Sequence, residues 1–211
     1  CHMPISAAQY ADAFATPLQP LLQEVLQHTE ALHPKAHMIS GHTQGMLLQG
    51  ISKMIRPHAV LEIGTFTGFG ALCLAEGMAA DGCLHTIEIR PDDAATAQSF
   101  FDHSPYRQQL HLHLGDARQI IPSLTPTWDL VFLDADKTSY IDYYEMVLPS
   151  MKTGGWLLAD NVLFHGEVLQ DVLKGKNAKA IAAFNEHVRA DTRTRQVLLT
   201  IRDGLLLVQK L

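Results

Sequence analysis

The sequence has little of several features that mark specialised classes of protein. Three cysteines in 211 residues, with no short pairing motif, exclude a disulfide-stapled small domain and argue against a zinc ribbon. No apolar run approaches the ~18 residues that a transmembrane helix needs. Charged residues reach only 18%, below the ~25% of typical globular chains, while apolar residues make up 47%. The composition therefore predicts a cytoplasmic globular domain of the size of an enzyme, with no membrane partner.

The first residues are interpreted apart from the rest. Cys1 and His2 precede Met3 and resemble a cloning remnant, so the native chain is expected to start at Met3. The following residues lack a basic segment that leads into an apolar one, so no secretory signal is expected. At roughly 150 residues per domain, the length allows one or two domains. We expect one domain, with a helical N-terminal arm (3–57) and an α/β part (58–211).

Charge is unevenly distributed along the chain. Residues 1–173 carry 8 basic and 19 acidic side chains, whereas residues 174–211 carry 8 basic and 3 acidic ones. The net charge of −6 disfavours broad binding to a nucleic-acid backbone. The basic C-terminal segment is either a solvated helix face or a contact for one anionic ligand.

The N-terminal arm shows helical periodicity. Apolar residues in 21–32 recur at helical spacing after Pro20, whose fixed φ suits the first turn of a helix. A second apolar stripe occupies residues 46–55. Residues 36–45 lie between the two stripes and are expected to form a polar connection that could reach a ligand.

From residue 58 onward, short apolar runs alternate with helical patterns. The predicted strands are 60–63, 84–89, 110–114, 130–133 and 156–159, and the predicted helices are 69–79, 91–103, 117–121, 140–148 and 178–190. Short apolar strands between helices indicate a parallel sheet covered on both faces.

Two further runs at the C-terminus complete the predicted sheet. Residues 196–201 and 205–208 flank Asp203-Gly204, a dipeptide typical of a tight turn between antiparallel strands. The predicted fold is therefore α/β: a Rossmann-like, doubly wound, mostly parallel sheet of seven strands with an antiparallel C-terminal hairpin.

A glycine-rich turn follows the first predicted strand. Residues 64–70 read G-x-x-x-G-x-G and lead into a helix, and glycines there let the backbone approach a ligand closely. Glu88, 24 residues after Gly64 and at the end of the second strand, is placed to accept hydrogen bonds from both hydroxyls of a ribose. These features predict a nucleotide-type ligand.

Two cofactors share this arrangement, a dinucleotide and S-adenosylmethionine. A dinucleotide fingerprint requires G-x-G-x-x-G, but Phe66 stands where the second glycine should be. Glu62, inside the strand end, would repel a pyrophosphate and suits a ligand with an ammonium group. S-adenosylmethionine carries an ammonium and no phosphate, so we favour the methyl donor over a dinucleotide and its dehydrogenase chemistry. Asp116, after the third strand, either caps the next helix or bonds the adenine amino group.

Carboxylates also follow the fourth and fifth predicted strands. If these strands are neighbours, Asp134, Asp160 and Asn161 converge at one rim of the sheet. Two carboxylates and an amide suit Mg²⁺, Mn²⁺ or Ca²⁺ rather than zinc. Lys137 lies three residues after Asp134, where a nearby cation would lower its pKa and make it a general base. Alternatively, Lys137 is a surface lysine paired with an aspartate.

Other polar side chains are given structural roles. His111 and His113 share one face of a strand, but two histidines without a third ligand nearby do not predict zinc. Three tyrosines within five residues are expected to pack in the core: Tyr140, Tyr143 and Tyr144.

Together these residues resemble the cation-dependent class I O-methyltransferases, the family of caffeoyl-CoA and catechol O-methyltransferases. The resemblance covers residues 36–210 and is closest at 61–70, at 134–144 and at 160–161. The family's usual aromatic residue at the position of Phe66 accounts for the missing glycine. The resemblance implies a methyl transfer to one hydroxyl of a vicinal dihydroxy aromatic compound or its CoA ester.

The resemblance also implies roles for individual residues. It implies a divalent cation, with Mg²⁺ favoured, on Asp134, Asp160 and Asn161, catalysis by Asp134 and Lys137, and a homodimer. The donor contacts that it implies are Met38, Ser40, Glu62, Gly64, Phe66, Gly70, Glu88, Asp116 and Asp134.

The chain departs from the family pattern near the expected acceptor. Phe164 and His165 stand where plant members usually have Trp-Asn, and both are expected to contact the substrate. Arg202 stands where the family usually has glycine. These departures leave the identity of the small aromatic acceptor open.

Two other functions are also compatible with the sequence. A tRNA hydroxyuridine could be the methyl acceptor at the same site, or the chain could be a nucleotide-binding protein without catalysis. The basic residues that could meet an RNA or the phosphates of a CoA ester are Lys174, Lys176, Lys179, Arg189, Arg193 and Arg195.

Overall fold

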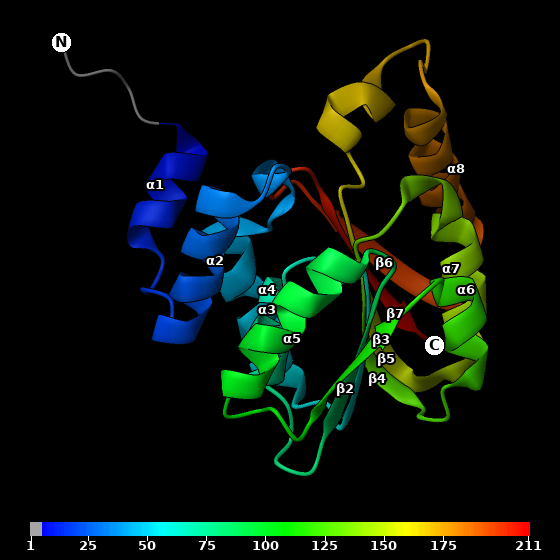
Figure 1. The fold of residues 1–211 in the computed structure, drawn as a ribbon. Helices are drawn as coiled ribbons and strands as arrows, with labels where there is room; N and C mark the ends of the chain where they lie inside the picture. Colours follow the sequence, from blue (N-terminus) through cyan, green and yellow to red (C-terminus); the bar gives the residue numbers. More distant parts are fainter. Residues whose placement is uncertain (1–5) are drawn as a thin grey trace, which may run out of the picture.

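The computed structural model describes residues 6–211, which form one sheet between two layers of helices (Figure 1). The interpretation of Cys1 and His2 as a remnant before Met3 concerns residues outside this range. Within residues 6–211, no helix is long and apolar enough to cross a membrane.

The sheet has seven strands in the order β3-β2-β1-β4-β5-β7-β6. The first five strands run parallel, and β7 pairs antiparallel with both β5 and β6. The strands are β1 (Ala59–Ile63), β2 (Cys83–Glu88), β3 (Leu110–Leu114), β4 (Trp128–Leu133), β5 (Met151–Asp160), β6 (Thr194–Leu199) and β7 (Leu205–Lys210). The predicted doubly wound sheet with its antiparallel C-terminal hairpin is confirmed.

Helices cover both faces of this sheet, and each helical layer has its own apolar core. The helices are α1 (Ala7–Phe14), α2 (Pro20–Leu32), α3 (Gly41–Ile55), α4 (Phe69–Ala75), α5 (Pro91–His103), α6 (Ala117–Ile120), α7 (Tyr140–Val147) and α8 (Lys176–Ala190). Buried residues of α2, α3, α4 and α5 form one core with the sheet, and those of α6, α7 and α8 form the other. Because α2 and α3 share a core with the sheet, the N-terminal arm is held against the α/β part (Figure 1).

Two helix boundaries differ from the prediction because of tertiary packing. Helix α3 begins at Gly41, inside the segment 36–45 that was expected to be a connection. Gly45 lies against the ring of Phe69 on α4, and this contact between helices holds the polar residues in a helix. Helix α4 ends at Ala75 rather than at residue 79, since Gly77 packs directly on the backbone of α3.

Helix α8 is anchored by one aromatic side chain. Phe184 is fully buried, and its ring lies edge-on to Tyr140 and Tyr144 of α7, with ring centroids 5.3 and 6.1 Å apart. The tyrosines expected in the core are therefore buried, and each also uses its hydroxyl in a hydrogen bond.

Removing this anchor should destabilise the fold. We expect Phe184→Ala to lower the free energy of unfolding by about 3–5 kcal/mol, the usual cost of truncating a buried phenylalanine. Urea unfolding of Phe184→Ala measures the loss. Phe14→Ala is the matched control because the Phe14 side chain is exposed, and it should cost little. Equal losses in the two variants would contradict the assigned packing.

Three histidines gather on the face of the sheet that α6 and α7 cover. His85 of β2 stacks on His113 of β3, with their ring nitrogens 2.9 Å apart, and His111 lies 4.8 Å from His85 between ring centroids. His85, which the sequence did not single out, joins the pair that it did. Among residues 6–211, no group of three or more His, Cys, Asp or Glu side chains has the geometry of a metal site.

The surroundings of His85 make stability depend on pH. Burial, with His111 and His113 as further causes, lowers the pKa of His85 from 6.5 to about 4. Between these values the unfolded chain binds a proton that the folded chain does not, so stability falls as the pH drops from 6.5 to 4. We expect urea midpoints to fall less steeply over this interval in His85→Gln than in the wild type. Identical pH profiles would show that His85 titrates normally in the folded protein.

Candidate active site

The sheet brings four site residues into one row. Register pairs Ile63 of β1 with Leu133 of β4 and Leu133 with Ala159 of β5, so the next residues, Gly64, Asp134 and Asp160, lie side by side. Glu88 joins the row from the end of β2, since Ile87 pairs with Ile63. The order of the sheet reverses between β1 and β4, and ligands of doubly wound folds bind at such a point.

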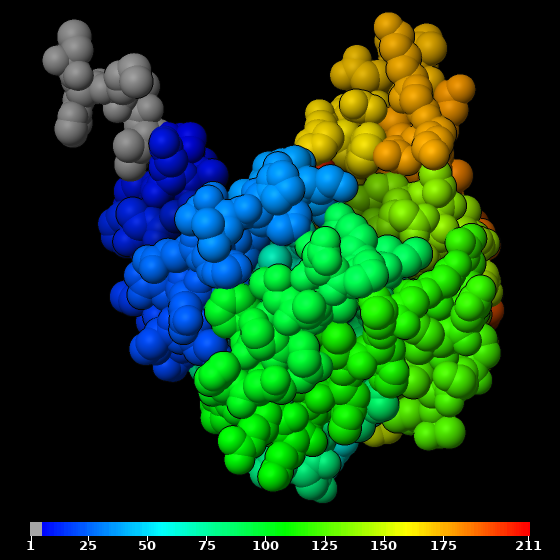
Figure 2. All heavy atoms as spheres, in the orientation of Figure 1, coloured from blue at the N-terminus to red at the C-terminus, as the bar shows by residue number. Residues whose placement is uncertain are grey.

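A cavity of about 940 Å³ runs along this row of strand ends. In Figure 2 the surface is hollowed between the N-terminal segment and the segment that leads into α8. A smaller pocket shares part of the cavity's lining and adds Glu62 and Gly70. The other predicted site residues line the main cavity: Met38, Ser40, Gly64, Phe66, Glu88, Asp116, Asp134, Lys137, Asp160, Asn161, Phe164 and His165.

Glu88 organises the glycine-rich turn. Its Oε2 accepts the backbone N–H of Phe66 at 2.7 Å, and its Oε1 accepts the backbone N–H groups of Ile89 and Arg90 at 3.0 Å each. A carboxylate has about four acceptor positions, two on each oxygen. Oε2 accepts this one bond and so keeps a position for a ligand hydroxyl at the cavity wall.

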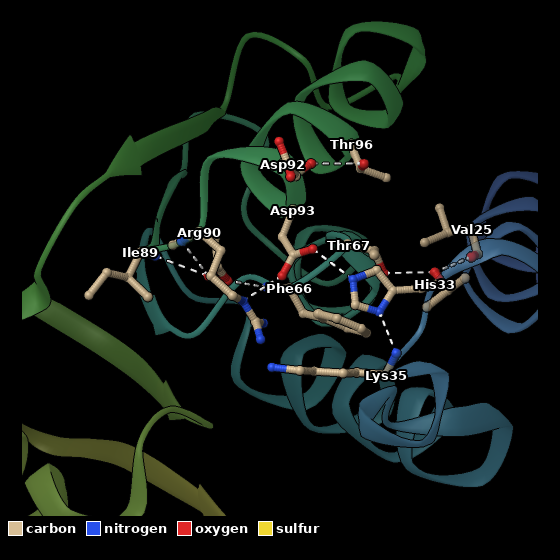
Figure 3. A network of polar contacts seen from close by, with 12 residues as sticks. Val25, His33, Lys35, Phe66, Thr67, Ile89, Arg90, Asp92, Asp93 and Thr96 are labelled. Carbon is tan, nitrogen blue, oxygen red and sulfur yellow. Dashed lines mark hydrogen bonds and ion pairs between the residues drawn. The ribbon is translucent and has the colours of Figure 1, made fainter.

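The side chain of Phe66 is held between the N-terminal arm and the sheet (Figure 3). His33, at the end of α2, meets the Phe66 ring edge-on at 4.5 Å, and the guanidinium of Arg90 lies 5.4 Å from the ring centre. Asp93 contacts both side chains, at 2.8 Å from His33 Nε2 and 2.5 Å from Arg90 Nε. The arm is thereby tied to the turn that carries the predicted donor contacts.

Glu62 is a buried carboxyl beside the cavity. The Oε2 of Glu62 accepts a hydrogen bond from the Thr86 hydroxyl at 2.5 Å, and Glu62 is only 1% exposed. Burial raises the pKa of Glu62 from 4.5 to about 8, with the charges of Asp134 and Glu88 adding to the effect. A ligand ammonium placed nearby would favour the ionised carboxylate.

Two expected donor contacts have different local roles. Asp116 caps α6, since its Oδ1 accepts the backbone N–H of Arg118 at 2.9 Å, and hydrogen bonds from Arg118 lower the pKa of Asp116. Asp116 therefore has the capping role, one of the two roles predicted for it, and it also lines the cavity. Ser40 precedes α3, and within residues 6–211 its hydroxyl makes no hydrogen bond to cap that helix.

Lys137 lies at the centre of the acidic end of the site. Its Nζ donates to Asp134 Oδ1 at 3.0 Å, to Asn161 Oδ1 at 2.8 Å and to the Tyr140 hydroxyl at 2.7 Å. Burial by itself would lower the pKa of Lys137, but Tyr140 and Asp134 outweigh it and raise the pKa above its ordinary value. Without a second cation in the site, Lys137 is therefore an ammonium.

Asp160 completes the cluster from the end of β5. Its Oδ1 accepts the backbone N–H of Asn161 at 2.7 Å, and its Oδ2 accepts the side-chain amide of Gln44 at 2.5 Å. Burial, followed by the charge of Asp134, raises the pKa of Asp160 from 3.8 to about 6. The buried carboxylate of Asp160 and the partly exposed one of Asp134 repel each other, which favours any cation between them.

Strained backbone gathers around the cavity. Six non-glycine residues among 6–211 have positive φ, and five of them line the cavity. Such conformations cost free energy and cluster at functional sites. The five are Phe66, Asn161, Phe164, His165 and Arg202.

Some contributors to the site were missed in the sequence. Gln44 on α3 donates a hydrogen bond to Asp160, which lies 116 residues further along the sequence. No local sequence pattern could reveal this contact. Tyr140 was assigned to packing, yet its hydroxyl also accepts from Lys137. His33 carried no signal because its partners, Phe66 and Asp93, come from other elements.

A doubly wound sheet with an acid at the end of β2, a buried carboxyl and a cluster of side-chain oxygens at its switch point is typical of class I methyltransferases. A family model described as O-methyltransferase matches residues 12–211. The chain belongs to the O-methyltransferase family, which confirms the predicted S-adenosylmethionine-dependent O-methyltransferase.

Individual relatives agree with this assignment. The chain is 29% identical to probable caffeoyl-CoA O-methyltransferase 1 of Dictyostelium discoideum, over 98% of this chain and 92% of that one. It is 30% identical to catechol O-methyltransferase of Niastella koreensis, over 74% of this chain and 72% of that one. The solved O-methyltransferase from Bacillus cereus in complex with SAH is 26% identical, with a TM-score of 0.87 over 97% of this chain and 96% of that one.

The close contact between Gly64 and Asp134 generates a stability prediction. Gly64 has φ +101°, and a Cβ there would overlap the carbonyl oxygen of Asp134. Because both groups are backbone, Gly64→Ala should cost more than about 2 kcal/mol and disturb the row of strand ends. Gly50→Ala is the control, since Gly50 lies within α3 with open space around it and should gain about 0.5–1 kcal/mol. Denaturant unfolding measures both, and equal stability of Gly64→Ala and wild type would contradict the contact.

Proposed function

We propose that the enzyme moves a methyl group from S-adenosylmethionine to one hydroxyl of a vicinal dihydroxy aromatic small molecule, with help from a divalent cation. The observation that carries this proposal is the convergence of Asp134, Lys137, Asp160 and Asn161 beside the ribose-type acid Glu88 in one cavity. The membership of the O-methyltransferase family supports the same chemistry.

The methyl donor would bind along the row of strand ends. Glu88 would accept a ribose hydroxyl through the open position on Oε2, and Asp116 would lie near the adenine. The donor's ammonium would meet the buried carboxyl of Glu62 or Asp134, both of which line the smaller pocket with Met38, Ser40 and Gly70. A carboxyl whose pKa is raised by burial gains most from such a charge.

The chemistry of the donor set fits a hard divalent cation. The oxygens Asp134 Oδ1 and Asn161 Oδ1 lie within 3.0 Å of one point, and an ammonium, a cationic group, stands there. Asp160 adds a second carboxylate next to them. When bound, Mg²⁺ would polarise the acceptor oxygens and lower the pKa of the reacting hydroxyl.

Lys137 would be the base that takes the hydroxyl proton. The ion pair with Asp134 and the hydrogen bond to Tyr140 keep its ammonium protonated, so Lys137 becomes a base only when Asp134 is engaged by another cation. Tyr140 would then position Nζ, since its hydroxyl is fixed by the carbonyl of Asp160 at 2.9 Å. Most of the rate would come from alignment of the acceptor oxygen with the methyl group.

The acceptor ring would lie against the turn after β5. Phe164 and His165 line the cavity there, with ring centroids 5.3 Å apart, and both are expected to pack on the ring. A tRNA acceptor is less favoured, because Arg189 and Arg193 of the basic segment are already paired with acidic side chains.

We further propose that the enzyme is a cytoplasmic homodimer. The family resemblance supports the dimer, and the free thiols of Cys73 and Cys83 suit a reducing compartment. Sedimentation equilibrium tests the oligomeric state.

Turnover assays test the reaction and its cation dependence. We expect release of S-adenosylhomocysteine from a panel of catechols, caffeate and caffeoyl-CoA with Mg²⁺, loss of turnover with EDTA, and recovery when Mg²⁺ is returned. Asp134→Asn should reduce turnover by about 10²-fold or more, because it removes charge at the reacting centre.

Asp102→Asn is the matched control, since Asp102 is exposed on α5 and distant from the cavity lining. Full turnover of Asp134→Asn in EDTA would contradict the metal role. Donor binding without turnover of any catechol would redirect the search to RNA acceptors.

A further inference from the structure

Arg202 occupies a costly backbone conformation at the mouth of the cavity. It lies in the turn between β6 and β7 with φ 46°. Residues other than glycine adopt this left-handed backbone conformation only rarely, because it brings their Cβ too close to the backbone. Glycine would satisfy the same turn without strain, as Gly204 does nearby at φ 87°. A large cationic side chain at this position therefore points to a use for the guanidinium.

The side chain reaches from the C-terminal hairpin to the segment before α3. Its Nη1 donates to the carbonyl of Ile39 at 3.2 Å, and a Cβ on Gly41 would lie 3.0 Å from the same atom. The guanidinium thus lies over a glycine and is held by one backbone oxygen. Ile39 and Arg202 both line the main cavity, so this bridge forms part of its wall.

Arg202 is an exposed residue, and it forms no ion pair with any of the described residues 6–211. The other long cationic side chains of the cavity each have a carboxylate partner: Arg90 with Glu88 and Asp93, Arg118 with Asp116, and Lys137 with Asp134. For Arg202, no carboxylate of residues 6–211 lies within ion-pair distance. A guanidinium has five N–H donors, and the one bond to Ile39 leaves the others available.

The backbone turn that carries Arg202 lies against the turn after β5, at the acceptor end of the cavity. Its neighbour Asp203 accepts the backbone N–H of His165 at 2.6 Å, and Leu163 donates to the Asp203 carbonyl at 2.9 Å. The turn of Arg202 is therefore joined to the turn after β5, which carries Asn161 and Phe164. Arg90 and Arg118 lie at the opposite end, beside the ribose-type and adenine-type acids.

We propose that Arg202 forms an anion subsite that selects aromatic acceptors carrying a carboxylate. A planar guanidinium binds a carboxylate through two parallel, charge-assisted hydrogen bonds, which an uncharged ester group does not form with the same strength. The inference rests on the proposed methyl transfer, because it defines the class of acceptor for that reaction. A cationic catechol should be the poorest ligand.

Paired ligands test the subsite directly. Calorimetric titration of the Mg²⁺ and S-adenosylhomocysteine complex with caffeate and with methyl caffeate compares two acceptors that differ in one charge. We expect caffeate to bind about tenfold tighter or more to the wild type, the effect of one charge-assisted hydrogen bond. The preference should vanish in Arg202→Met, persist in part in Arg202→Lys and be unchanged in Arg107→Met, a variant of an exposed arginine outside the cavity.

Arg202→Gly separates recognition from folding. Glycine suits φ 46°, so this variant should be at least as stable as the wild type while it loses the preference for caffeate. An unchanged preference in Arg202→Gly, or no binding of caffeate by the wild type, would overturn the subsite. Weaker S-adenosylhomocysteine binding with an unchanged acceptor preference would assign Arg202 to the donor's carboxylate and also overturn it.

Turnover distinguishes the subsite from the reaction on which it rests. Methylation of both acceptors with a ratio that Arg202 does not influence supports the reaction and rejects the subsite. Preferential binding of caffeate without methylation rejects the proposed reaction and retains the anion subsite.

Discussion

The acidic end of the site depends on the hydrogen bonds that the ammonium of Lys137 donates. It joins Asp134, at the end of β4, to Asn161, just beyond β5, and it also binds the hydroxyl of Tyr140 on α7. The carboxylates of Asp134 and Asp160, at neighbouring strand ends, would otherwise repel each other. One internal cation therefore stabilises this arrangement, and the divalent cation that we propose would compete with it for the same oxygens.

The pairing of cationic side chains with carboxylates differs between the two halves of the cavity. Along the half that we propose for the donor, Arg90 and Arg118 are each paired with acidic side chains. Along the acceptor half, the pairing is incomplete, because Arg202 contacts a backbone carbonyl instead of a carboxylate. The positive-φ residues lie mainly around this half, where the backbone bends repeatedly to form the wall.

The N-terminal arm is part of the site rather than an appendage. Its His33 packs on Phe66 and pairs with Asp93 (Figure 3). Its Gln44 donates a hydrogen bond to Asp160. Since α2 and α3 also share a core with α4 and the sheet, movement of the arm would alter the glycine-rich turn and the carboxylate cluster together.

The sequence by itself determined the elements and the chemistry at their ends. Apolar runs that alternate with helical patterns predict the parallel sheet, and Asp203-Gly204 predicts its hairpin, because periodicity and turn preferences act locally. Residues that directly follow strands, such as Glu88 and Asp134, could be predicted to meet because parallel strands end at one edge.

Only the tertiary structure decided which groups touch. The contacts of Gln44 with Asp160, of His33 with Phe66 and of Arg202 with Ile39 join elements that are distant in sequence. The start of α3 at Gly41 likewise depends on a neighbour brought by folding, the ring of Phe69 on α4. Local patterns carry no information on such contacts, since packing and burial depend on the whole chain.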